Sequence, residues 1–160
     1  MLESQTKATE EQAHFTGPFS AQFAVGLQGQ DQVTLVSGHN QTWEIQAVGC
    51  AAFLAGVQNL LQQHPDPHRW TAPQGSSHVA VLLRELVDRI QGRFALPVQA
   101  EEICHCRMVK TEVVDHAIVA GAETVEQVRR WTSASSACGT CRPDIEKLLQ
   151  YRRPTVAQGT

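Results

Sequence analysis

The sequence lacks the features that mark several common functional classes. Its 13 lysines and arginines do not outnumber its 16 aspartates and glutamates, and the net charge of −3 argues against nucleic acid as a main partner. The longest apolar stretch, "AVGCAAFLAGV", falls short of the roughly 20 residues that span a bilayer. There is no glycine-rich nucleotide loop, no nucleophile paired with a base, and no flavin or NAD fingerprint. We therefore expect neither a membrane protein nor an enzyme.

The N-terminal segment "MLESQTKATEEQAHF" also lacks the basic start and apolar centre of a signal peptide, which indicates a cytoplasmic protein. Five cysteines are present, and in a reducing compartment cysteines more often bind metal or do redox chemistry than form structural disulfides. Hydrophobic residues make up 42% of the chain, enough for a packed core. The composition thus favours a globular metal-binding or redox protein.

Local patterning predicts the first of two domains. Residues 1–14 form a leader, and residues 154–160 form a tail. Alternating apolar residues in "FSAQFAVGLQ", "DQVTLVSG" and "QTWEIQAV", separated by turn-forming "GQDQ" and "GHNQ", predict a three-stranded antiparallel meander. Two amphipathic helices follow, in "GCAAFLAGVQNLLQQH" and "HVAVLLRELVDRI". We therefore predict an α+β domain over residues 15–97.

The second domain, residues 98–153, is expected to be a small all-α helical unit, so that the whole chain belongs to the α+β class. Its first helix stops at Gly121, its second opens on a capping box of Thr124 with Gln127, and its third begins at Pro143. Three short helices make a thin core, which usually needs a metal, a disulfide or a partner to hold it. The cysteines are the obvious stabilising groups.

Four of the five cysteines form two close pairs, one near each end of this helical domain. Loops of one or two residues let two thiolates bind neighbouring metal positions, and two such loops supply four soft ligands. The "CGTC" loop precedes a helix N-terminus, where free amides favour anionic sulfur. From the residues alone, the four could hold an iron–sulfur cluster or zinc, or remain disulfides or free thiols. They are Cys104, Cys106, Cys138 and Cys141.

The complete pattern is more specific than either pair. C-x-C is followed by 31 residues of helix, turn and helix, and then by C-x-x-C with a further helix. The motifs "ICHC", "ETVEQVRRWTSASSACGTC" and "RPDIEKLL" resemble the bacterioferritin-associated-ferredoxin-like (BFD-like) [2Fe-2S] domain, which is also the middle domain of NifU proteins. The resemblance covers about one third of the chain and implies a [2Fe-2S] cofactor. By the same resemblance the cluster ligands are Cys104, Cys106, Cys138 and Cys141.

The first domain is similar to the iron–sulfur assembly scaffold domain of NifU proteins, in which a glycine–cysteine pair opens a helix after the third strand. Cys50 matches that cysteine, but the two other scaffold cysteines are missing. The resemblance therefore implies a degenerate scaffold that serves as a docking or dimerisation surface. We favour a buried, structural Cys50. A metal site that joins Cys50 to His64 and His68 is the alternative.

Two further features concern the predicted cluster. His105 lies between two of the expected ligands, and we expect it to face solvent or an outer shell, although histidine ligates iron in some clusters. Cations near the cluster would stabilise its negative charge; the alternative is a plain solvated face. These cations are Arg107, Lys110, Arg129, Arg130, Arg142 and Lys147.

Taken together, the sequence predicts a [2Fe-2S] protein that passes electrons, or the cluster's iron and sulfide, to a redox partner or an iron–sulfur acceptor protein. The NifU resemblance implies cluster assembly, nitrogen-fixation metabolism and a homodimer. The alternative is an interaction or regulatory module in which zinc or a cluster only stabilises the fold. A third possibility is true assembly scaffolding through Cys50.

Overall fold

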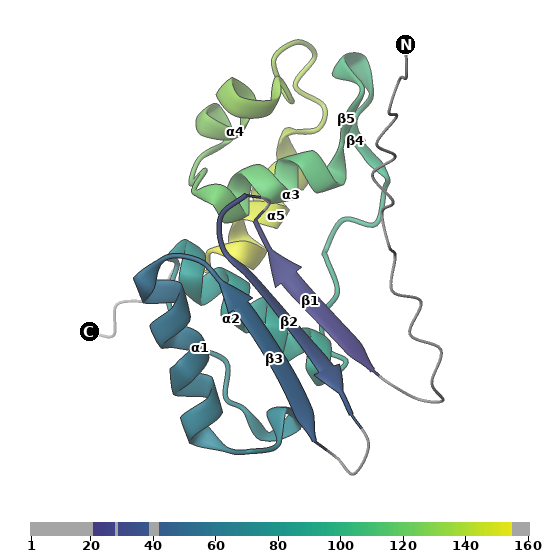
Figure 1. Cartoon of the computed structure of the whole chain (residues 1–160). Helices are drawn as coiled ribbons and strands as arrows, with labels where there is room; N and C mark the ends of the chain where they lie inside the picture. Colours follow the sequence, from purple (N-terminus) through teal and green to yellow (C-terminus); the bar gives the residue numbers. More distant parts are fainter. Residues whose placement is uncertain (1–20, 28, 39–41, 155–160) are drawn as a thin grey trace, which may run out of the picture.

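The computed structural model describes residues 21–27, 29–38 and 42–154. It contains a three-stranded sheet with helices and then a mainly helical region, so the predicted α+β class is confirmed (Figure 1). The expected leader lies outside the described residues, as does nearly all of the expected tail. Within the described part of the chain, each helix is too short or too polar to cross a membrane.

The sheet is the meander that the alternating pattern predicts. Its strands are β1 (Gln22–Gly26), β2 (Gln32–Ser37) and β3 (Trp43–Val48), paired antiparallel in that order. Val33 and Leu35 of the central strand are buried, whereas polar side chains occupy most of the opposite face. This alternation is typical of an antiparallel sheet with one face on a core and one face toward solvent.

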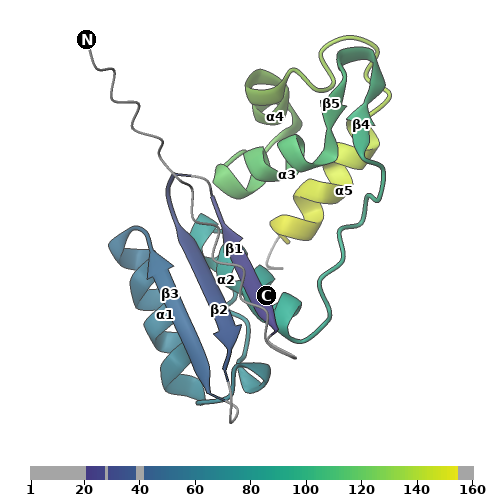
Figure 2. The same ribbon diagram turned by 45° about the vertical axis from the view of Figure 1, so that its right-hand side comes forward.

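Two helices cover the buried face of the sheet (Figures 1 and 2). They are α1 (Ala51–Gln63) and α2 (His78–Ile90), separated by the short 3-10 helix η2 (Pro67–Arg69). Each helix has a side-chain cap at its start: Cys50 accepts from the amide of Phe53, and Ser77 accepts from the amide of Ala80. The shared core contains Leu27, Phe53, Val57, Leu60, Trp70, Leu82, Leu83 and Leu86.

The C-terminal region follows a long linker and contains the three predicted helices. Gly121 ends the first with a φ of +129°, a conformation that favours glycine. The capping box of Thr124 and Gln127 opens the second, and both of its hydrogen bonds are present. A short hairpin, β4 paired with β5, precedes the helices and was not predicted from the sequence. The elements are β4 (Glu102–Cys104), η3 (His105–Arg107), β5 (Val109–Lys110), α3 (Thr111–Ala120), α4 (Val125–Thr132) and α5 (Arg142–Arg152).

A buried arginine joins the two regions. Arg152, at the end of α5 and only 4% exposed, donates to Glu85 of α2 at 2.7 Å. The same guanidinium donates two hydrogen bonds to Asp115 of α3, at 2.7 and 2.6 Å. Burial lowers the pKa of Arg152, but the two carboxylates outweigh it and raise that pKa above its ordinary value. Arg152 therefore stays charged and connects α2, α3 and α5.

Candidate metal centre

The β4–β5 hairpin positions the first cysteine pair. Cys104 is the last residue of β4 and pairs with Val109, directly after a register shift between Glu102 and Cys104. Cys106 lies in the tight η3 turn that follows. The turn closes at Met108, which adopts the left-handed conformation with a φ of +53°. The hairpin thus sends one thiol toward the core of the C-terminal region and leaves the other on the turn.

The second pair lies on the loop between α4 and α5. Gly139 has a φ of +75°, as expected for the tight "CGTC" turn, and the Arg142 amide donates to its carbonyl at 3.0 Å. Cys141 is the N-cap residue of α5, which places its sulfur at the positive end of that helix. Arg107 of the first loop donates to the Ser136 hydroxyl of the second at 3.0 Å. The two cysteine loops are thereby held against each other.

The four sulfurs converge on one cavity of about 340 Å³, which we call the cysteine pocket. Sγ of Cys106 lies 3.7 Å from Sγ of Cys104 and 3.4 Å from Sγ of Cys138. Two thiolates on one tetrahedral metal ion, with metal–sulfur bonds of about 2.3 Å, are about 3.8 Å apart. The spacing therefore fits metal ligation by these thiols. The pocket is lined by Cys104, Cys106, Cys138 and Cys141, together with Thr140 and neighbouring residues.

The pocket is half buried and half open. Cys104 and Cys141 are 1% and 5% exposed, whereas Cys106 and Cys138 are exposed. In Figure 2 the hairpin and the start of α5 lie together at the end of the C-terminal region away from the sheet. Two thiols thus face the apolar core and two face the surface.

Hydrogen bonds favour the thiolate form at two of the four positions. The side chain and amide of Thr140 lower the pKa of the Cys138 thiol to about 7. Burial raises the pKa of Cys104, but hydrogen bonds from the amide of Ser135 and from neighbouring groups outweigh it and lower that pKa. The pKa of Cys141 is raised, first by burial and then by Cys104. One deprotonated thiol beside a protonated one is expected of close, coupled pairs.

Charged side chains around the pocket mostly have partners. His105 lies at the rim of the pocket: its side chain is 86% exposed, and its Nδ1 lies 2.7 Å from Glu102, which also lines the pocket. Lys110 pairs with Glu101 and Glu112, and Arg142 pairs with Glu126 and Glu146. His105 therefore faces solvent, in agreement with the sequence prediction.

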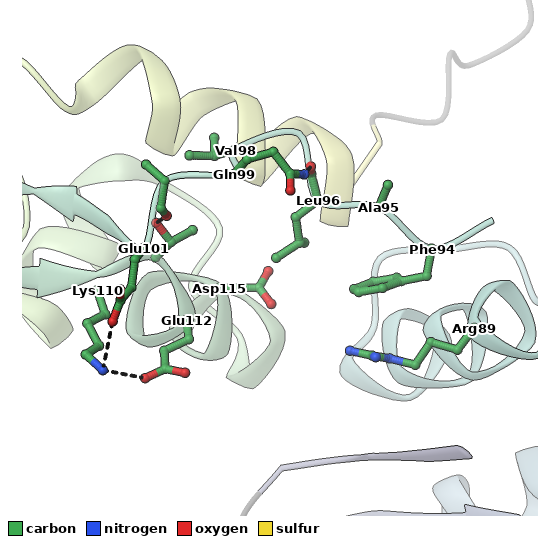
Figure 3. A pocket seen from close by; sticks show the side chains of 12 residues that line it. Arg89, Phe94, Ala95, Leu96, Val98, Gln99, Glu101, Lys110, Glu112 and Asp115 are labelled. Carbon is green, nitrogen blue, oxygen red and sulfur yellow. Dashed lines mark hydrogen bonds and ion pairs between the residues drawn. The ribbon is translucent and has the colours of Figure 1, made fainter. Parts of the chain in front are cut away.

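A larger cavity, of about 570 Å³, lies between the linker and α3 and contains no cysteine (Figure 3). Its charged groups are engaged with each other or with the core. Lys110 contacts two glutamates at its rim, Asp115 is held by Arg152, and Arg89 lies 4.1 Å from the centre of the Phe94 ring. With these charges neutralised locally, the cavity has no convergent polar groups of the kind that bind a ligand.

Cys50 differs from its prediction. It is exposed rather than buried, because it occupies the N-cap position of α1 at the end of the sheet. The histidine near its sulfur is His78, at 3.8 Å, and not His64 or His68, which the alternative metal site would have used. His64 accepts from the amide of Asp66, and the ring of His68 packs on Trp43. Sequence reasoning missed His78 because it lies 28 residues from Cys50.

Comparison with known proteins identifies the cysteine pocket. Residues 102–151 match the BFD-like [2Fe-2S] binding domain. The [2Fe-2S] cofactor predicted from the sequence is thus confirmed, and the four converging thiols fit it. The match covers the hairpin, α3, α4 and all of α5 except its last residue. The resemblance of residues 15–97 to an assembly scaffold stays a prediction.

One curated relative shares part of this sequence. The assimilatory nitrate reductase electron transfer subunit of Bacillus subtilis (strain 168) is 38% identical over 53 residues, which is 32% of this chain and 7% of that protein. The chain therefore spans only a small part of the length of this relative. No solved structure matches significantly.

Proposed function

We propose that this chain carries electrons to or from a partner protein through a [2Fe-2S] cluster bound by Cys104, Cys106, Cys138 and Cys141. The observation that carries the proposal is the asymmetry of the cysteine pocket, with two thiols in the core and two at the surface. When bound, such a cluster accepts and releases one electron at a potential set by hydrogen bonds, charge and exposure. An edge facing the surface lets a docked partner approach closely.

The residues of the chain have separate roles in this proposal. Cys104 and Cys141 anchor the cluster to the core of the C-terminal region, and Cys106 and Cys138 hold its outer edge. The amide of Ser135, which hydrogen-bonds both buried sulfurs, supports their negative charge. Met108 is an exposed apolar side chain beside the first loop, where a partner protein would bury it.

We also infer that the chain is not itself an enzyme. The described residues offer the cysteine pocket for redox chemistry, and the charged groups of the larger cavity are already paired. A separate enzyme would then supply or consume the electrons. The description of the Bacillus subtilis relative as an electron transfer subunit supports this division of labour.

Cluster assembly is the second candidate function, and the exposed edge of the pocket also supports it. An acceptor protein could reach Cys106 and Cys138 directly and replace them as ligands. Transfer of the cluster and transfer of an electron are distinguished by the fate of the iron, which leaves the chain in the first case and stays in the second. A homodimer remains a prediction for either function.

The first test uses the anaerobically purified full chain. Iron, acid-labile sulfide and zinc are quantified on the sample whose visible and EPR spectra are recorded before and after dithionite. Two irons and two sulfides per chain, with visible bands that bleach to a paramagnetic state, are expected. Reoxidation of the reduced protein by cytochrome c, with iron content unchanged, is the expected sign of electron transfer.

A matched pair of cysteine variants makes this test specific. Cys106→Ser removes a proposed ligand, and we expect loss of the visible bands and of cytochrome c reduction. Cys50→Ser changes the one cysteine outside the pocket and should leave both unchanged. A colourless protein whose zinc is lost in Cys106→Ser, or a reduced cluster that does not pass its electron on, would overturn the electron-transfer proposal in favour of a metal-stabilised interaction module.

A further inference from the structure

Three potential metal ligands meet at one end of the three-stranded sheet, in the region without the cluster. Asp31 lies in the turn before β2, Cys50 follows β3, and His78 is the first residue of α2. Because the strands are antiparallel, the turn after β1 and the last residue of β3 lie at the same end of the sheet (Figure 1). Distant parts of the sequence thereby bring a carboxylate, a thiol and an imidazole together.

The separations of these atoms match a tetrahedral zinc site. Sγ of Cys50 lies 3.8 Å from Oδ2 of Asp31 and 3.8 Å from Nε2 of His78, and the last two atoms are 3.0 Å apart. With bonds of about 2.3 Å to sulfur and about 2.0–2.1 Å to nitrogen or oxygen, tetrahedral ligands are about 3.6 Å apart for the sulfur pairs and about 3.3 Å for the third. Each of the three observed separations is close to the separation expected around a tetrahedral zinc ion.

The carboxylate is held in place for this role. Asp31 is 3% exposed, and its Oδ1 accepts from the Cys50 amide at 2.7 Å, which leaves Oδ2 toward the thiol and the imidazole. A side chain at Gly49 would collide with Asp31, so the chain passes close to the carboxylate at this point. A buried carboxylate needs a compensating charge. Among the described residues, the ion-pair partner of Asp31 is His78, which is charged only when protonated.

The identity of residue 50 is not explained by helix capping. Cys50 does cap α1, since its sulfur accepts from the Phe53 amide at 3.4 Å. Serine, threonine, aspartate and asparagine are the preferred N-cap residues, however, and any of them would perform this task. A thiol at this position adds a soft, ionisable metal ligand that these side chains lack.

We propose that Asp31, Cys50 and His78 bind one zinc ion per chain, separately from the [2Fe-2S] cluster. One sulfur, one nitrogen and one oxygen donor form a mixed set that suits zinc. A carboxylate and a thiolate together supply two negative charges for the divalent cation. Cys50 is exposed and the His78 side chain is 40% exposed, so the fourth coordination position faces the surface and takes a water molecule.

The test uses the full chain with its cluster loaded, so that the cysteine pocket cannot take zinc. After a chelator wash, zinc chloride is titrated in competition with a chromophoric chelator, and metals are quantified. The expected result is one zinc per chain beyond two irons. X-ray absorption at the zinc edge should show one sulfur at about 2.3 Å and nitrogen or oxygen donors at about 2.0–2.1 Å.

Two variants and one control assign the ligands. Cys50→Ser keeps a capping side chain, and His78→Ala removes the imidazole. Each should weaken zinc binding by more than about 100-fold, because even outer-shell partners of a metal contribute about 10- to 100-fold. His116→Ala, which changes an exposed histidine on α3, should bind zinc as the parent does. Circular dichroism checks that all variants are folded.

Several outcomes would overturn this proposal. They are less than one zinc per chain, a zinc shell of sulfur alone, and unchanged zinc affinity in folded Cys50→Ser and His78→Ala. The result is independent of the proposed electron transfer. Failure of the zinc site leaves iron content and the visible bands intact, whereas failure of the cluster in Cys106→Ser leaves the ligands around Asp31 in place.

Discussion

The two regions of this chain differ in what stabilises their cores. The sheet and its two helices bury Phe53, Trp70 and a set of leucines, so a continuous apolar core stabilises them. The core of the C-terminal region contains mostly valine, isoleucine and alanine, and it includes Cys104 and Cys141. The first region depends on apolar burial, whereas in the second two of the four proposed cluster ligands are themselves core residues. Loss of the metal should therefore affect the two regions unequally.

Removing the cluster is the strongest way to test this contrast. We expect the apo protein to lose amide-exchange protection in α3, α4 and α5, because the hairpin and the start of α5 would lose the cofactor that joins them beside a thin core. The sheet, α1 and α2 should keep their protection. The measurement is hydrogen exchange by mass spectrometry on holo and anaerobically chelated protein. Equal protection in both regions after cluster loss would show that the C-terminal helices need no metal.

Replacing the buried arginine tests the junction between the regions. Arg152→Met removes the cation shared by Glu85 and Asp115, and it leaves the buried Glu85 and the partly buried Asp115 without that partner. We expect a loss of about 3–5 kcal/mol in the free energy of unfolding, measured by urea denaturation. Arg142→Met is the matched control, since its ion pairs are exposed to solvent and should change the free energy of unfolding far less. Similar losses in the two variants would mean that Arg152 does not hold the regions together.

A cavity in the first core should weaken that region and spare the cluster. Phe53 is fully buried between α1 and the sheet, and Phe53→Ala should lower the free energy of unfolding by about 3–5 kcal/mol. Leu61→Ala, an exposed position on the same helix, should cost much less. The visible absorbance of the folded variant should match the parent. Bleaching of the cluster in folded Phe53→Ala would show that the two cores are coupled more tightly than their composition indicates.

The sequence predicted best what is decided locally. The stop at Gly121, the capping box at Thr124 and the helix start near Pro143 each depend on a few adjacent residues, and the structure contains all three. The two cysteine pairs lie together around one pocket, as expected from the helical segment between them, whereas the resemblance to a known domain supplied the ligand set. Strand alternation likewise located the meander, since one face of it is buried.

The features that sequence analysis missed depend on distant contacts or on very short elements. β4 and β5 are too short to show an alternating pattern. Arg152 was unremarkable in sequence, because arginine is almost never fully buried without a partner and its partners lie 37 and 67 residues away. Cys50 was expected inside, but its place directly before a helix is an N-cap position. The glycine–cysteine step before an apolar helical run was the signal that pointed there.

The smallest predicted effect concerns the C-terminal region alone. Thr124 accepts from the amide of Gln127 at 3.2 Å, and the Gln127 side chain accepts from the amide of Thr124 at 3.2 Å. Thr124→Ala should cost about 1 kcal/mol, and Thr124→Ser, which keeps the hydroxyl, should cost less. In holo protein the cluster holds the loop after α4 from its other side, so the loss should appear as faster amide exchange in α4 with unchanged iron content. If Thr124→Ala also loses iron, then the capping box contributes to the cysteine pocket, and the C-terminal region is more cooperative than its thin core suggests.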